Sequence, residues 1–152
     1  MRTEGEISLF TDGKFCKSER GELQLTEYGI SGIPVFQLST YAVRAVREGH
    51  KAELRINFMP ELSEEELKKL LYARKKACPY KKEKELLVGL FPEKLIKILI
   101  SQKQLVSAIR EFPLEVQDGM SFSQAQVCSG GVDTSQVNSQ TMESKLLSLI
   151  HI

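Results

Sequence analysis

The sequence predicts an α+β protein in which antiparallel strands enclose a group of short helices. Apolar and polar residues alternate in several short runs before residue 58, and the alternation returns after residue 112. Between these runs, apolar residues recur at helical spacing. We therefore expect a β domain built from residues 1–58 and 112–128, with a four-helix insert at residues 59–111.

The first strands are predicted close to the N-terminus. Residues 6–16 alternate, and Asp12-Gly13 is a strong hairpin turn signal between two short strands. Residues 21–26 alternate again and predict a third strand. A small antiparallel sheet is the expected result.

A helix is predicted to follow the turn at residues 29–32. Pro34 suits the first helical turn, where a missing N–H costs little, and Gly49 suits the C-terminal end. The unpaired N–H groups at the start of this helix favour anions or polarised oxygens near the turn. Ser31 could cap the helix or contact a ligand, and capping is the favoured role.

A strand and four helices are predicted next. Residues 52–58 show the cleanest alternation in the chain, which predicts a strand with one solvated face. Ser63 to Glu66 form a capping box that opens a helix, and Pro79 ends that helix near residue 77 or 78. Three more short helices are expected at residues 83–90, 92–101 and 102–111, and together the four predict a small separate bundle.

Basic residues cluster in the insert between Lys68 and Lys84. A nucleic-acid contact is one interpretation, but Tyr72 and Tyr80 are the only aromatic residues among these cations. A solvated helix face, paired with nearby glutamates, is the favoured interpretation. The prediction is therefore no nucleic-acid partner.

The chain is expected to return to the sheet and then enter a glycine turn. Residues 112–117 and 122–127 predict two strands joined by an Asp118-Gly119 turn. Gly130 and Gly131 lack Cβ atoms, so their backbone can approach a flat or anionic ligand, although an ordinary loop is the simpler alternative. We expect this turn to lie at an end of the sheet. Residues 141–145 then supply several polar groups within five positions.

Two runs of the sequence resemble one known enzyme family. VCSGGVD followed by QTMESK, and LTEYGISG further upstream, are similar to motifs of the BaiN/RdsA-like (aminoacetone-oxidase-like) family of NAD(P)/FAD-dependent oxidoreductases. The chain departs from the family at Cys128, Ser129 and Ser139, and Glu27 replaces a histidine whose role therefore cannot be transferred. The likeness extends loosely over residues 6–146 and is specific in these two runs.

The resemblance implies a fold, a cofactor and a set of site residues. It implies a barrel-like β domain with a helical subdomain, both inserted into a Rossmann-type FAD domain that is mostly absent from this chain, to which residues 129–146 would return. By resemblance, the flavin is bordered by Gly130, Gly131, Val132, Glu143 and Ser144. The substrate side is expected at Tyr28, Gly29, Ser31 and Gly32. FAD is the implied cofactor, with NAD(P)H as a possible electron donor and a small molecule as substrate.

Composition excludes several other classes of protein. The chain has 152 residues, 41% of them hydrophobic, and a net charge of +1, so no overall field attracts nucleic acid or an anionic membrane. Its three cysteines are widely spaced and predict reduced thiols rather than disulfides or a zinc site. No apolar run is long enough to span a bilayer and no signal-peptide pattern is present, so a cytoplasmic location is expected.

The sequence contains no complete active site of its own. It has no dinucleotide-binding G-x-G-x-x-G, no P-loop and no nucleophile or metal constellation, and residues 147–152 do not fit the family. We therefore expect an internal piece of a flavoprotein that is inactive alone and needs the remainder of that chain. The alternatives are a standalone α+β module that binds an acidic partner through its lysine-rich helices, and a purely structural piece.

Overall fold

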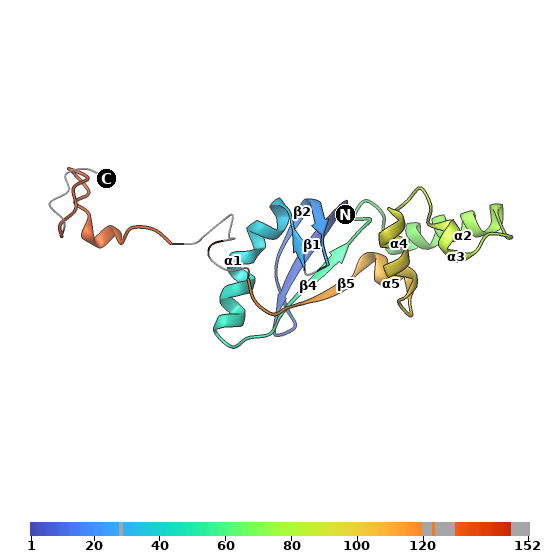
Figure 1. Ribbon diagram of the computed structural model, residues 1–152, viewed down its shortest axis with the longest axis horizontal. Coiled ribbons are helices and arrows are strands. Elements are labelled where there is room, and N and C mark those ends of the chain that lie inside the picture. Colours follow the sequence, from blue (N-terminus) through green and yellow to red (C-terminus); the bar gives the residue numbers. More distant parts are fainter. Residues whose placement is uncertain (28, 120–122, 124–129, 147–152) are drawn as a thin grey trace.

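A computed structural model of the chain describes residues 1–27, 29–119, 123 and 130–146. It confirms the α+β class, with five antiparallel strands and a series of helices between the fourth and the fifth (Figure 1). The sheet has the order β3-β2-β1-β4-β5 and curls into part of a barrel (Figure 1). None of the helices in the described residues is long and apolar enough to cross a bilayer.

The first two strands form a long hairpin. β1 (Arg2–Thr11) pairs with β2 (Lys14–Leu25), and Asp12 and Gly13 form the turn with φ values of 48° and 76°. Positive φ at both central positions suits the twist of a two-residue hairpin, as the Asp-Gly pair predicted. The expected third strand at residues 21–26 is instead the second half of β2. The register shift opposite Leu9 and Phe10 lies near the start of β2, so the pairing with β1 continues unbroken from Lys17 to Gln24.

A very short strand leads into the first helix. β3 (Ile30–Ser31) pairs with the end of β2, and α1 (Ile33–Arg47) begins directly afterwards with Pro34 in its first turn. The helix buries Pro34, Leu38, Ala42 and Ala45 against the sheet. Gly49 follows with a φ of 87°, in agreement with the predicted helix end. The predicted helix is therefore confirmed, and the strand that precedes it was not foreseen.

β4 (Ala52–Asn57) lies between β1 and β5 (Phe112–Val116). Its alternate residues are buried, as the period-2 pattern predicted. The expected next strand at residues 122–127 lies outside the described residues apart from Ser123.

Four helices connect β4 to β5. α2 (Glu64–Ala77) starts with the predicted capping box, in which the Ser63 hydroxyl accepts from Glu66 N and the Glu66 carboxylate accepts from Ser63 N. The Ser63 groups that donate to this carboxylate lower the pKa of Glu66. The remaining helices are α3 (Glu83–Leu86), α4 (Glu93–Ile100) and α5 (Leu105–Arg110), each shorter than its predicted range.

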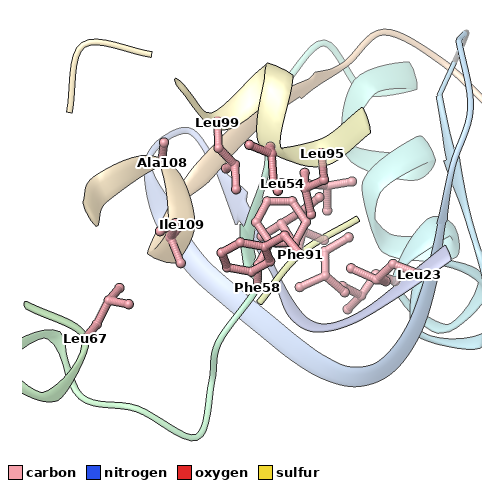
Figure 2. Close-up of a cluster of buried hydrophobic side chains, with 14 of the residues drawn as sticks. Leu23, Leu54, Phe58, Leu67, Phe91, Leu95, Leu99, Ala108 and Ile109 are labelled. Carbon is pink, nitrogen blue, oxygen red and sulfur yellow. The ribbon is translucent and has the colours of Figure 1, made fainter. Parts of the chain in front are cut away.

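The sheet and the helices share one hydrophobic core. Ile7, Leu9 and Ile56 of the sheet belong to the same buried cluster as Leu95 and Leu99 of α4. Figure 2 shows Phe58 and Phe91 at the centre of this cluster, with Leu67 of α2 toward its periphery near Ile109. Thus the expected separate bundle does not have a core of its own, because its inner side chains pack into the core of the sheet.

Candidate functional site

The predicted flavin-side segment, residues 130–146, is held together by its own hydrogen bonds. Asn138 N donates to Glu143 O at 2.8 Å, and Met142 N donates to Asn138 O at 2.8 Å, while Val137 and Ser144 form an isolated β-bridge. Lys145 closes the unit, because its N donates to Gln136 O at 2.7 Å and its Nζ to Ser135 O at 2.9 Å. The segment therefore forms a compact double-stranded turn.

Most polar groups that the sequence offered as ligand contacts are used inside this turn. The Glu143 carboxylate accepts from Thr141 Oγ1 at 2.9 Å, and the Ser144 hydroxyl accepts from Leu146 N at 3.2 Å. Asp133 accepts from the hydroxyl and the N–H of Ser135, which lowers the pKa of that carboxyl. The polar residues of this run therefore stabilise a short loop.

The glycine turn itself is open. Gly130 has a φ of 131°, and a Cβ added at either Gly130 or Gly131 would meet no atom of the described residues within 4 Å. Val132 is 56% exposed. These three residues therefore present free backbone and one apolar side chain that a flat ligand could approach.

The structure does not bring this turn to the sheet. In Figure 1 residues 130–146 lie apart from the sheet, beyond α1 and at the opposite end of the molecule from α2 and α3. The expected position of the glycine turn at an end of the sheet is not what the structure shows. Cys128 and Ser129, which precede the glycines, lie outside the described residues.

The predicted substrate-side residues gather at the β3–α1 junction, and the structure gives them structural roles. Gly29 O accepts from Thr26 N at 2.9 Å and from Thr26 Oγ1 at 2.8 Å, which closes the turn. Ser31 pairs with Gln24 in the sheet and does not cap α1, because Gly32 occupies the N-cap position. Tyr28 lies outside the described residues.

Gly32 is required by a close approach between two backbones. Its φ is 123°, and a Cβ at this position would lie 2.4 Å from Glu22 O of β2. The start of α1 is therefore pressed against β2, and Pro34 continues this contact, since a Cβ on Gly21 would lie 3.1 Å from Pro34 Cγ. The glycine of this motif is explained by packing without any ligand.

An FAD site would need more than the described residues supply. Gly130 and Gly131 fit one edge of a flat ring system, because their backbone is open and carries no side chain. In the described part of the chain, however, no parallel strand–glycine turn–helix unit is present to bind a pyrophosphate, since all pairings in the sheet are antiparallel. These residues therefore fit a bordering contact to a flavin and not a whole binding site.

The basic segment between Lys68 and Lys84 has few acidic partners. Lys68 pairs with Glu64, and Lys84 pairs with Glu93 at 3.3 Å. Arg74 and Lys75 donate instead to backbone oxygens, of Val88 at 2.8 Å and Lys81 at 3.2 Å. Among the described residues, the remaining four cations form no ion pair: Lys69, Lys76, Lys81 and Lys82. The expected pairing with glutamates is thus made by two of the eight basic residues.

A groove of about 870 Å³ lies beside this segment, between α2, α3 and α5. Leu71, Leu87 and Leu105 are among its apolar lining residues, and charges of both signs, including Lys75 and Glu111, also line it. In Figure 1 the helices that line the groove, α2, α3 and α5, lie far from residues 130–146. It therefore does not extend the predicted flavin side.

Sequence reasoning missed one polar cluster at the β1–β2 turn. His50 Nδ1 lies 2.8 Å from Asp12 Oδ2, and Lys51 N donates to Asp12 Oδ1 at 3.0 Å. The backbone hydrogen bond from Lys51, together with His50, lowers the pKa of Asp12. The cluster ties the hairpin turn to the start of β4. In the described residues, no group of three His, Cys, Asp or Glu side chains could hold a metal ion.

Comparison with known proteins identifies similar sequences. A family model described as "HI0933-like protein barrel and H2TH domain" matches residues 4–118. The chain is 33% identical over 162 residues to 3-dehydro-bile acid delta(4,6)-reductase of Clostridium scindens, covering 95% of this chain and 40% of that protein. It is 30% identical over 148 residues to ribosomal RNA dihydrouridine synthase of Haemophilus influenzae, covering 87% of this chain and 35% of that protein.

The chain therefore spans two fifths or less of the length of these curated relatives. The matched region runs from within β1 to the end of β5 and includes all four helices between β4 and β5. Residues 130–146 lie beyond the region that the family model matches.

Proposed function

The chain belongs to the HI0933-like family, and on that premise we propose that it forms the barrel-like and helical part of an FAD-dependent oxidoreductase. The observation that carries the proposal is the family match over residues 4–118, together with a curled antiparallel sheet of the expected kind. Membership of this family supports an oxidoreductase that uses a flavin. FAD as the cofactor, NAD(P)H as the electron donor and the cytoplasm as the location belong to the proposal.

The reaction we propose is a reduction. One relative is named a reductase and the other a dihydrouridine synthase, and both names describe the addition of hydrogen to a substrate. A bound flavin would supply the electron transfer, and the protein would supply position and exclude competing reactions. We propose a small-molecule substrate, as the family resemblance implied.

The residues of this chain would have positioning roles. Gly130, Gly131 and Val132 would border the flavin, because no atom of the described residues lies within 4 Å of a Cβ added at either glycine and the Val132 side chain is exposed. Glu143 and Ser144 would shape the turn behind them through the hydrogen bonds that they already make. Gly29, Ser31 and Gly32 would hold the β3–α1 junction rigid on the substrate side. The remainder of the flavoprotein would have to bring the two regions together.

The test is a chain extended at both ends to the length of its relatives, purified and examined for the visible absorption of flavin. We expect a yellow protein from the extended chain and a colourless one from the 152-residue chain, which lacks a pyrophosphate site in its described part. A colourless, FAD-free extended chain would contradict the proposal.

A matched pair of variants tests the role of the glycine turn. In the extended chain, Gly130→Val should lower the ratio of flavin to protein, because a branched side chain would occupy the open edge. Gly89→Val is the control, since Gly89 also has a positive φ and no atom within 4 Å of an added Cβ. Equal flavin content in both variants would remove Gly130 from the flavin site and leave the family-based function intact.

A second candidate substrate is a uridine in RNA, as in the name of the second relative. One observation favours it. Between Lys68 and Lys84 the chain has eight basic residues and one acidic residue, Glu83, and only two of the eight form ion pairs in the described residues. A small-molecule substrate gives no reason for such a surface.

A further inference from the structure

We infer that the exposed face of α2 and the α2–α3 connection form a docking surface for the phosphate backbone of RNA. The surface is defined by Lys69, Tyr72, Lys76, Tyr80 and Lys82, and we name it the α2 basic face. The inference rests on the second candidate substrate. It departs from the sequence-based expectation of no nucleic-acid partner, because only two of the eight basic residues form the expected ion pairs in the described residues. It concerns binding alone, so it can fail while the flavin chemistry stands.

Helical geometry places the residues of α2 on one stripe. Positions 69, 72 and 76 are three and four residues apart, so they lie on the same side of the helix. Leu67, which is fully buried, and the half-buried Leu70 and Leu71 lie on the opposite side. The stripe therefore faces away from the core. In Figure 1 α2 lies at the end of the molecule farthest from residues 130–146.

The cations of this face are available to a partner. Lys69, Lys76 and Lys82 are exposed and form no ion pair within the part of the chain that the structure describes. Glu65 begins the same stripe at its N-terminal end, and Glu66 is close enough to Lys69 that this cation contributes to its lowered pKa. The positive charge is therefore concentrated on the C-terminal half of α2 and beyond it. Each cation that neutralises a phosphate releases a condensed counterion, which makes binding favourable and dependent on salt.

Two exposed aromatic rings distinguish RNA from an acidic polypeptide as the partner. Tyr72 is 71% exposed and Tyr80 is 80% exposed. Rings of this kind stack on unpaired bases, whereas a chain of carboxylates needs only the cations. The arrangement of cations with exposed aromatic rings therefore fits a structured RNA with unpaired bases in a loop.

The experiment measures binding of the 152-residue chain to a fluorescein-labelled RNA stem-loop by fluorescence anisotropy at several KCl concentrations. The test variant is the triple Lys69→Gln, Lys76→Gln, Lys82→Gln. The control is the triple Lys14→Gln, Lys51→Gln, Lys103→Gln, which removes the same charge from other exposed positions. All substituted side chains are exposed, and circular dichroism melting curves check that both variants stay folded.

We expect the test variant to bind at least about tenfold more weakly at 0.1 M KCl, with the slope of log K against log salt reduced by roughly two to three. The control should change neither value by more than a small amount. Tyr80→Leu should weaken binding by about fivefold or more without altering the slope, because stacking is not electrostatic.

Three results would overturn the inference. The wild-type chain could show no binding to the stem-loop, or both triple variants could lose affinity equally, which would mean that net charge alone acts. Poly-glutamate could also compete for the face as effectively as unlabelled RNA, which would assign the surface to an acidic polypeptide.

Discussion

At the residue scale, glycines in this chain have two different explanations. Gly32 must be glycine because a Cβ at this position would lie only 2.4 Å from the backbone oxygen of Glu22. Gly130 has a φ of 131°, which favours glycine, and no atom of the described residues lies within 4 Å of an added Cβ, so its backbone conformation and not a close contact explains the missing side chain. A glycine in this chain can therefore serve close packing at one position and a special backbone conformation on an open surface at another.

Gly32→Ala is expected to destabilise the chain by on the order of 2–3 kcal/mol, since the variant adds both backbone strain and a collision with β2. Gly49→Ala is the matched control, because Gly49 has a φ of 87° but no atom within 4 Å of an added Cβ. It should cost about 1 kcal/mol, from backbone strain alone. The measurement is urea-induced unfolding. Equal losses in the two variants would argue against a close contact between α1 and β2.

At the scale of the element, the start of α2 was predicted correctly from the sequence. The reason is local, because Ser63 and Glu66 satisfy each other's N–H groups within one turn. At the start of α3 the Glu85 carboxylate accepts from Lys82 N at 2.8 Å, but α4 and α5 lack such a signal, since no side chain hydrogen-bonds to cap their N-termini. Their apolar residues were recognised, but their ends depend on contacts with other elements.

Ser63→Ala is expected to lower the stability of α2 by roughly 1 kcal/mol, whereas Ser63→Asn should retain most of it because asparagine also caps helices. The contribution of Glu66 should depend on pH. Its pKa is lowered in the folded chain, so its stabilisation is present above the usual glutamate pKa of about 4 and is lost as the pH falls through the lowered value. Unfolding curves at several pH values would check this. Identical pH slopes for wild type and Glu66→Gln would contradict it.

At the scale of the whole molecule, one core joins the sheet to the helices. Ile109 of α5 is fully buried in the same cluster as Ile7 of β1, and its carbonyl accepts from Phe58 N at 2.8 Å at the end of β4. The domain boundaries at residues 59 and 111 remain a prediction. The shared cluster favours cooperative unfolding of the two parts.

Ile109→Ala is therefore expected to cost about 2–4 kcal/mol and to lower the protection of β1 and α4 amides together. Ile98→Ala is the control, because Ile98 is 41% exposed on α4 and should cost much less. Native-state hydrogen exchange provides the measurement. A loss of protection confined to the helices would show that they unfold as a separate unit.

The sequence by itself determined the features that depend on neighbours along the chain: the Asp12-Gly13 hairpin, α1, the buried alternation of β4 and the capping box of α2. Only the tertiary structure decided that residues 21–26 continue β2, that the helices share the core of the sheet, and that Gly32 is packed against β2 while the 130–146 turn lies apart. The physical reason is the range of the interactions. Turn geometry and capping act within a few residues, whereas core packing and the pairing of charges join residues that the order of the sequence keeps far apart.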